Sequence, residues 1–336
     1  MGNYTDMTRK KQDVVLDKYQ PKKKRNLEMS KMIDSKLSER GLELFKQCST
    51  FNQFIATKDK ETKKLTASNP CKNRFCPICA WRKARKDAFM LSILMTAIQV
   101  EKKQEFLFLT LTTPNVKAKD LKAEIDRFNK AFSKMFRRRK VMSSIKGYVR
   151  KLEITYNKER DDYNPHFHVI LAVNKSYFTD PNYYITQKEW LEMWRECTGL
   201  TGVTENGTDE ITQLYIKKIK GIQEDNAISE VAKYSAKDYE MTVNQQVFDT
   251  FYTALKGRQL ITFNGVFKEY RKKFELGELD KFKERDTNEY VYKLLATWNR
   301  DYLKYKETYE LMTEAEKIEF NNVYQDELEI ENMEEK

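Results

Sequence analysis

Hydrophobic positions recur with two different periods along the middle of the chain, and these periods predict both strands and helices. Residues 105–113 are nearly all apolar and rich in strand-forming residues, which is typical of a strand buried on both faces. Residues 147–156 and 166–173 have the pattern of two more strands, and the polar loop between them predicts an antiparallel hairpin. Apolar residues three and four apart predict helices over residues 81–98 and 121–136.

Capping signals extend this alternation towards the C-terminus. Residues 186–189 have the Thr-x-x-Glu pattern of a capping box, so a helix should begin there. A further strand is predicted over residues 211–219, and Asp225 can cap a helix that runs to Tyr239. Beyond about Thr242 the pattern is mostly helical.

Four segments of different character predict the organisation of the chain. Residues 1–30 are polar and basic and predict a flexible arm. Residues 31–104 carry most of the cysteines and a helix, and residues 105–242 carry the predicted strands. Residues 243–336 should form a mostly helical C-terminal region that ends in an acidic tail.

The charge of the chain favours a polyanionic partner. The net charge is +11 and the pI is about 9.1, although residues 301–336 are strongly acidic, so the rest of the chain is more basic than this value. Cations near phosphates release condensed counterions, which favours nucleic acid as the partner. No apolar run approaches the roughly 20 residues of a membrane span, and the first residues lack the apolar core of a signal peptide. We therefore expect a cytoplasmic protein without a membrane partner.

The two histidines of the chain, His166 and His168, predict a metal site. Residues two apart on a strand share a face, so both imidazoles should point the same way. If the hairpin is symmetric about residues 159–160, Glu153 lies opposite His166 and its carboxylate joins them. Two imidazoles and a carboxylate are ligands that suit Mn²⁺ or Mg²⁺ acting on phosphate. The alternative is a polar hairpin edge that binds no metal.

Tyr234 is the candidate nucleophile. On the predicted helix, Glu230 and Lys237 lie within about 60° of it, so the three share a face. A phenol with a pKa near 10 needs roughly 4 kcal/mol to ionise at pH 7, and Lys237 with a metal can supply this stabilisation. Such a trio alone is usually a solvated helix face, so this interpretation depends on the histidine pair.

Four of the five cysteines have the spacing of a zinc site. Cys71, Cys76 and Cys79 form a C-x4-C-x2-C pattern, and Cys48 could complete a tetrahedral set. The alternative is a group of reduced thiols. A zinc ion here would be structural and would present nearby arginines to DNA, namely Arg74, Arg82 and Arg85. A second basic group that we expect to bind DNA ends the helix over residues 121–136: Arg137, Arg138 and Arg139.

Three ordered motifs carry a resemblance to a known family. Residues 108–115, 164–170 and 230–237 resemble the first motif, the histidine motif and the nucleophile motif of the rolling-circle plasmid replication initiators. These initiators belong to the HUH endonuclease superfamily, and the chain is similar to the branch carried by small Gram-positive plasmids. The resemblance implies an α+β fold, in which an antiparallel sheet is flanked by helices. Residues 105–242 would be its nicking domain, with the histidine strand central.

The resemblance also implies a mechanism. Tyr234 would form a 5′-phosphotyrosine bond at a nick in the origin and leave a 3′-OH as the primer. His166 and His168 would bind the metal, and Glu230 would activate water for the terminating cleavage as a general base. The partners would be single-stranded or hairpin origin DNA, together with a host helicase and polymerase.

Three alternatives remain open at this point. A relaxase or a single-strand transposase would share the chemistry, and a non-catalytic origin-binding repressor would share the basic charge. A nucleotide hydrolase of the histidine-triad kind would want a third histidine where Ile170 stands. The sequence predicts neither the oligomeric state nor the origin sequence.

Overall fold

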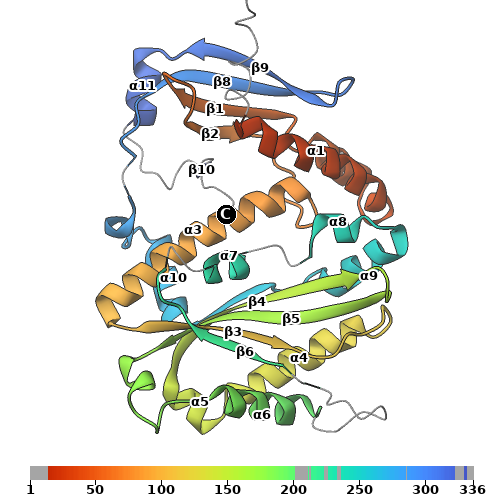
Figure 1. Ribbon diagram of the computed structural model, residues 1–336. Coiled ribbons are helices and arrows are strands. Elements are labelled where there is room, and N and C mark those ends of the chain that lie inside the picture. Colours follow the sequence, from red (N-terminus) through yellow and green to blue (C-terminus); the bar gives the residue numbers. More distant parts are fainter. Residues whose placement is uncertain are drawn as a thin grey trace, which may run out of the picture. The chain divides into compact units, whose positions relative to one another are not determined.

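A computed structural model describes residues 14–200, 211, 213–222, 226–232, 236–284, 286–321 and 329–330. The chain forms two compact units, one of residues 1–83 with 283–336 and one of residues 84–282. Each unit contains a five-stranded antiparallel sheet, and Figure 1 shows the elements of both. The expected α+β class, with antiparallel sheets flanked by helices, is confirmed.

The sheet of residues 84–282 has the predicted histidine strand at its centre. Its strand order is β6-β3-β5-β4-β7. The bounds are β3 (Glu105–Thr112), β4 (Ile145–Asn157), β5 (Asp162–Val173), β6 (Tyr215–Lys218) and β7 (Ile261–Gly265). Strands β4 and β5 form the predicted hairpin. On its other side β5 pairs with β3.

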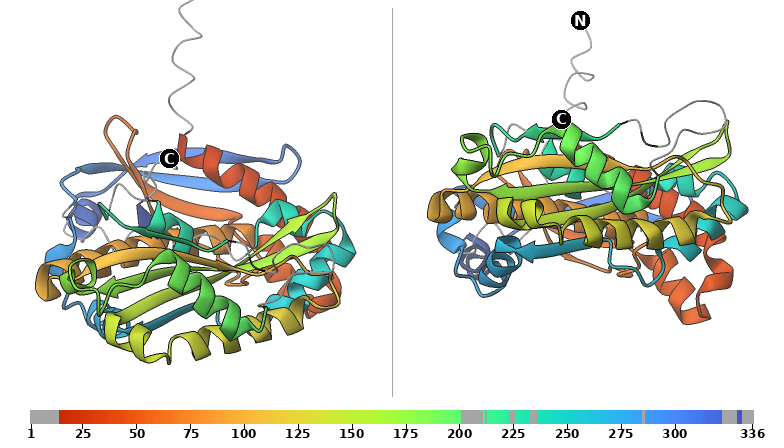
Figure 2. Two further views of the ribbon diagram at one scale, coloured as in Figure 1. Left: turned by 60° about the horizontal axis from the view of Figure 1, so that its bottom comes forward. Right: turned by 90° about the horizontal axis from the view of Figure 1, so that it is seen from below.

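One face of this sheet is covered by two helices that lie side by side (Figure 2). They are α4 (Leu121–Met135) and α6 (Gln187–Thr198), and the predicted capping box of Thr186 and Glu189 opens α6. Phe167 of β5 packs against Phe128 of α4, at 5.0 Å between ring centroids. This face is an aromatic core.

The other face is covered by α3 (Pro77–Lys102), α7 (Ala227–Ala232) and α10 (Val266–Glu275). Along β5, Ile170 and Ala172 belong to this core, and His166 and His168 continue the same face. One end of the face is therefore apolar and the other carries the histidines. The remaining elements of this unit are α5 (Arg139–Ser144), η2 (Lys175–Phe178), α8 (Asp238–Met241), α9 (Gln245–Leu255) and η3 (Asp280–Phe282).

The second sheet combines strands from the two ends of the chain in the order β10-β2-β1-β8-β9. Its strands are β1 (Phe51–Thr57), β2 (Lys63–Ser68), β8 (Tyr290–Asn299), β9 (Lys304–Leu311) and β10 (Glu329–Ile330). The helices of this unit are α1 (Val14–Met32), η1 (Asp34–Lys36), α2 (Glu39–Gln47) and α11 (Glu314–Asn321), and the start of α3 also belongs to it. None of the described helices is long and apolar enough to cross a membrane.

The structure differs from the expected organisation at both ends. Most of residues 1–30, expected as a flexible arm, form α1, whose buried face includes the polar Lys23 and Asn26 and so lacks an apolar period. Residues 243–336, expected as mostly helical, contain β7, β8 and β9. Strand β9 is half polar along its length and pairs with β8, which pairs in turn with the distant β1. Pairing between positions so far apart leaves no local signal in the sequence.

Candidate active site and metal centres

Two histidines and a glutamate converge on the polar end of the sheet face. Glu153 of β4 lies directly opposite His166 of β5, so the predicted hairpin register is confirmed. The Oε2 atom of Glu153 lies 3.0 Å from Nε2 of His168 and 3.4 Å from Nε2 of His166. The three ligand atoms lie within 4.8 Å of one another. Two imidazoles and a carboxylate at this separation fit a divalent cation.

The other ring nitrogens of the histidines face neighbours that orient the rings. Nδ1 of His166 lies 3.2 Å from the carbonyl oxygen of Asn164, and Nδ1 of His168 lies 3.4 Å from Oγ1 of Thr110. The ring of Phe108 stacks on His168 at 5.5 Å. When Nδ1 carries the proton for these neighbours, Nε2 keeps its lone pair for a metal.

The charge on Glu153 is stabilised by the same histidines. Burial by itself opposes ionisation of this carboxyl. While Nε2 of His166 and of His168 carries a proton rather than a metal, hydrogen bonds from these groups outweigh burial and hold the pKa of Glu153 well below the usual range. The site therefore offers an anionic oxygen ligand at neutral pH.

The first motif is tied to the histidine strand by side-chain hydrogen bonds. The amide of Asn164 donates to Oδ1 of Asn115 at 2.6 Å, and Oγ1 of Thr112 donates to Oδ1 of Asn164 at 3.2 Å. Asn115 donates in turn to Asp162 at 2.7 Å. These bonds hold residues 108–115 and 164–170 together beside the histidines.

Glu230 of α7 lies beside the histidines. Its Oε2 atom is 3.8 Å from Nε2 of His168, and its side chain is 29% exposed, so water can reach it. Tyr234 lies outside the described residues.

The predicted continuous helix over residues 225–239 is wrong. Helix α7 ends at Ala232, and Lys237 is the extended N-cap of α8, with φ −73° and ψ 135°. Glu240 of α8 accepts a hydrogen bond from the backbone N–H of Tyr156 at 2.9 Å, which ties α8 to β4. This tertiary bond competes with the helical pattern, so the helical angle no longer supports Lys237 as a neighbour of Tyr234. The Nζ atom of Lys237 lies 3.7 Å from Oε1 of Glu240.

Two buried charged residues near the site were missed by the sequence analysis. Lys151 is 7% exposed and pairs in register with His168, so it lies on the face that carries the ligands. Its alternation with Glu153 along β4 was a signal that could have identified it. Glu240 is 8% exposed, and burial raises its pKa. No local pattern distinguishes Glu240 from a solvated glutamate.

The four predicted cysteines come together in the other unit. The Sγ distances are 3.5 Å for Cys48 and Cys79, 3.7 Å for Cys71 and Cys79, and 3.6 Å for Cys48 and Cys76. Tetrahedral zinc with bonds of about 2.3 Å separates its sulfurs by about 3.8 Å, so this donor set fits zinc. Hydrogen bonds from the other three thiols, first from Cys48, lower the pKa of Cys79, whereas burial raises the pKa of Cys76.

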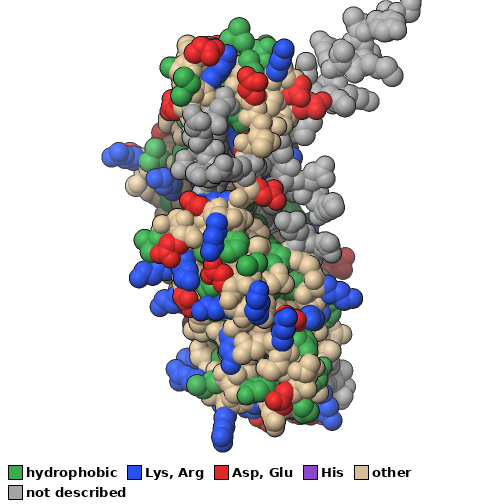
Figure 3. Space-filling model, turned by 90° about the vertical axis from the view of Figure 1, so that its left-hand side faces the viewer, with side chains coloured by type: hydrophobic (Ala, Val, Ile, Leu, Met, Phe, Trp, Pro, Cys, Tyr) green, Lys and Arg blue, Asp and Glu red, His purple; other side chains and the backbone are tan. Residues whose placement is uncertain are grey.

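The arginines expected to bind DNA differ in their exposure to solvent and in the contacts of their side chains. Arg74 is exposed, Arg82 donates to Oγ of Ser68 at 2.6 Å, and Arg85 is half-buried. In the second group, Arg137 and Arg139 are exposed. Arg138 instead pairs with Glu196 at 2.6 Å. In the view of Figure 3, lysine and arginine side chains are spread over the visible face rather than gathered at one spot.

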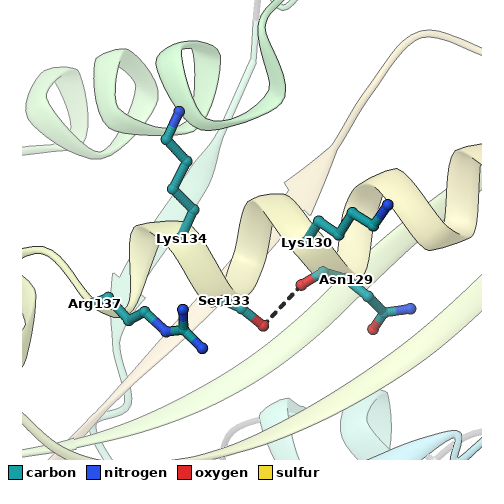
Figure 4. Close-up of a pocket in the computed structure, with 5 residues that line it drawn as sticks. All are labelled: Asn129, Lys130, Ser133, Lys134 and Arg137. Carbon is teal, nitrogen blue, oxygen red and sulfur yellow. Dashed lines mark hydrogen bonds between the residues drawn. The ribbon is translucent and has the colours of Figure 1, made fainter.

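A shallow hollow of about 490 Å³ lies along α4. Figure 4 shows four of its lining residues on this helix, with Lys134 pointing towards the neighbouring helix, and the fifth, Arg137, in the turn that follows α4. The lining residues are Asn129, Lys130, Ser133, Lys134 and Arg137. Because α4 packs on the Phe167 face of the sheet, this hollow is separate from the histidine site.

Comparisons with known proteins identify the family of the chain. Residues 62–309 match the model of a family described as replication protein. A Protein rep from Staphylococcus aureus is 54% identical over 231 residues, which cover 68% of this chain and 96% of that protein. The chain belongs to this replication protein family. A Protein rep from Streptococcus pneumoniae is 33% identical over 306 residues, covering 85% of the chain and 93% of that protein.

Membership in the family confirms the resemblance to rolling-circle initiators of Gram-positive plasmids. A further relative, a Protein rep from Bacillus amyloliquefaciens, is 32% identical over 275 residues, covering 75% of the chain and 78% of that protein. No solved structure matches the replication protein at a significant level. The general function of this replication protein is the initiation of plasmid replication.

Proposed function

We propose that this replication protein nicks one strand of its plasmid origin through an HUH site. The observation that carries the proposal is the convergence of His166, His168 and Glu153 on one point of the sheet face. These residues would hold Mn²⁺ or Mg²⁺, which when bound polarises the scissile phosphate. Tyr234 supplies the nucleophile. Its oxygen bonds to phosphorus, the bond from phosphorus to the 3′ oxygen breaks, and the leaving oxygen takes a proton to become the 3′-OH.

Two charged residues, Lys237 and Glu230, have separate roles in the first and the terminating cleavage. The hydrogen bond with Tyr239 raises the pKa of Lys237, so this side chain stays cationic and can stabilise the phenolate and the phosphate. Glu230, beside His168 and open to water, is the general base of the terminating cleavage. It removes a proton from water, whose oxygen attacks the phosphotyrosine, and Tyr234 leaves with the returned proton.

The proposal also includes a zinc site, the limits of the nicking domain, the DNA contacts and the partners. Cys48, Cys71, Cys76 and Cys79 hold a structural zinc, and the nicking domain lies within residues 84–282. The DNA contacts come from Arg74, Arg82, Arg85, Arg137 and Arg139, and Lys130 and Lys134 line the hollow together with Arg137. Arg138 contributes less because it is paired with Glu196. The DNA is single-stranded or hairpin origin DNA, and a host helicase and polymerase extend the 3′-OH in the cytoplasm.

A covalent-adduct experiment tests the nicking proposal. The protein is incubated with an origin-derived single strand and Mn²⁺, and the products are separated on a denaturing gel. We expect an adduct with the wild type and with Tyr302→Phe, a matched control because the side chain of Tyr302 is 77% exposed and belongs to the other unit. Tyr234→Phe should form no adduct.

Glu230→Ala separates the two steps of the reaction. This variant should form the adduct at the first cut and fail to release it. An adduct with Tyr234→Phe, or none with the wild type, would show that the nicking mechanism is wrong. Origin binding without any adduct would instead indicate a non-catalytic repressor.

A further inference from the structure

Helix α1 buries one face, and two of its buried positions are polar. Leu16, Tyr19 and Met29 are buried at spacings typical of a packed helix. Between them, Lys23 and Asn26 are each 0% exposed. Buried lysine is rare unless its charge is compensated, so these two positions need an explanation.

The ammonium of Lys23 is held by the end of α2. Its Nζ atom donates to the carbonyl oxygens of Lys46 and Cys48, each at 2.7 Å, and to Oδ1 of Asn26 at 3.1 Å. Carbonyls at a helix C-terminus lack partners within their helix and carry partial negative charge, so a cation suits them. Cys48, the residue after α2, is one of the four cysteines.

Asn26 reaches the cysteine cluster directly. Its Nδ2 atom donates to Sγ of Cys76 at 3.3 Å and to the carbonyl oxygen of Phe45 at 3.0 Å. Both amide hydrogens are therefore used, and one stabilises negative charge on a sulfur. Such outer-shell donors orient metal ligands and tune their basicity.

The charges of the two groups complement each other. Among the described residues no carboxylate forms an ion pair with Lys23, whose ammonium instead donates to the carbonyl oxygens of Lys46 and Cys48 and to Asn26. Four thiolates around one Zn²⁺ have a net charge of −2, which a buried ammonium partly neutralises. Without a common metal the four sulfurs no longer share a fixed centre, so Cys76 and Cys48 no longer hold the partners of Asn26 and Lys23 in place.

We infer that Lys23 and Asn26 are outer-shell partners of the four-cysteine metal site, and that α1 packs stably only while the metal is bound. The inference rests on the proposed zinc site. It makes α1 a helix whose docking depends on the metal, rather than an independent basic arm. The two residues are positioning residues because they act on the metal through its ligands.

Hydrogen exchange of the full-length chain tests the dependence of α1 on the metal. Exchange is measured with zinc bound and after a chelator has removed it, and the zinc content is determined in both samples. Peptides from residues 16–32 should lose protection on zinc removal, while peptides from β4 and β5 in the other unit keep theirs. Unchanged protection of α1 after zinc has left would overturn the inference.

Zinc release to a chromogenic chelator tests the two side chains. Lys23→Met keeps the length of the side chain but removes its charge, and Lys24→Met is the matched control because Lys24 is exposed. Lys23→Met and Asn26→Leu should release zinc at least about tenfold faster than wild type, as expected for lost outer-shell partners. Lys24→Met should release it at the wild-type rate.

The outcomes distinguish this inference from the proposals on which it rests. Equal release from Lys23→Met and Lys24→Met would overturn the inference and leave the zinc site standing. A wild-type protein that holds no zinc would overturn both. Neither result bears on the covalent adduct of Tyr234, and if Lys23→Met fails to fold, the exchange measurement on wild type decides.

Discussion

Glu153 is the residue on which the histidine site depends most. It contacts both imidazoles from the neighbouring strand, and it supplies the one anionic oxygen among the three clustered ligands. Its position follows from the period of two along a strand, because Leu152 and Ile154 prefer the opposite, apolar face. A shift of the hairpin by one residue would turn Glu153 away from the histidines.

Replacing this carboxylate should weaken metal binding at the site. Glu153→Gln keeps the size of the side chain and removes its charge. The Mn²⁺ concentration for half-maximal adduct formation should rise at least about tenfold, since even outer-shell partners contribute that much. Glu159→Gln, an exposed carboxylate in the hairpin loop, is the matched control. Equal Mn²⁺ requirements for both variants would exclude Glu153 as a ligand.

Glu240 should make the stability of the protein depend on pH. Burial raises its pKa in the folded state, so the folded protein holds this proton more tightly than the unfolded chain does. Stability is therefore lost as the pH rises from about 4.3, the ordinary pKa of glutamate, through the higher folded value. Glu240→Gln avoids this cost and can still accept the hydrogen bond from Tyr156. Its melting temperature should exceed that of wild type at pH 7, and the difference should shrink towards pH 4.3. A difference that is constant with pH would contradict this explanation.

Among the elements, α7 and α8 show where local pattern and tertiary contacts disagree. The apolar spacing across residues 225–239 satisfies one long helix, and Ala227 and Val231 are buried as that pattern predicts. The backbone nevertheless leaves the helix before Lys237, where α8 is tied to β4 through Glu240. The bond that ties α8 to the sheet therefore comes from a residue far away in the sequence.

The contact between β4 and β7 requires glycine on both strands. A Cβ atom at Gly147 would lie 2.6 Å from both the carbonyl oxygen of Asn264 and the nitrogen of Val266. Gly147→Ala should therefore lower the free energy of unfolding by about 1–3 kcal/mol, because backbone must move. Gly199→Ala is the control, since its Cβ meets nothing within 4 Å and only its left-handed φ opposes the change, at about 1 kcal/mol. Denaturant unfolding measures both, and an equal loss in the two variants would contradict the clash.

At the scale of the whole molecule, one unit is built from a continuous segment of the chain and the other from two separate segments. Residues 84–282 are continuous, and the long neighbouring strands β4 and β5 are joined by a short turn. The other unit takes β1 and β2 from the first part of the chain and β8 and β9 from the last. The family match over residues 62–309 includes strands of both units, so relatives share sequence in both sheets.

The sequence by itself determined the parts of this protein whose signals are local. The strand period, the hairpin symmetry and the cysteine spacing predicted the cluster of His166, His168 and Glu153 and the four-cysteine cluster. Tertiary structure alone decided that α1 packs with Lys23 and Asn26 buried, that Glu240 ties α8 to β4, and that β8 pairs with β1. In each case the stabilising partner is a backbone carbonyl, a backbone N–H, a cysteine sulfur or a strand edge that lies far away in the sequence. A polar residue that is buried and hydrogen-bonded to such a partner has the same kind of neighbouring sequence as a polar residue exposed to solvent.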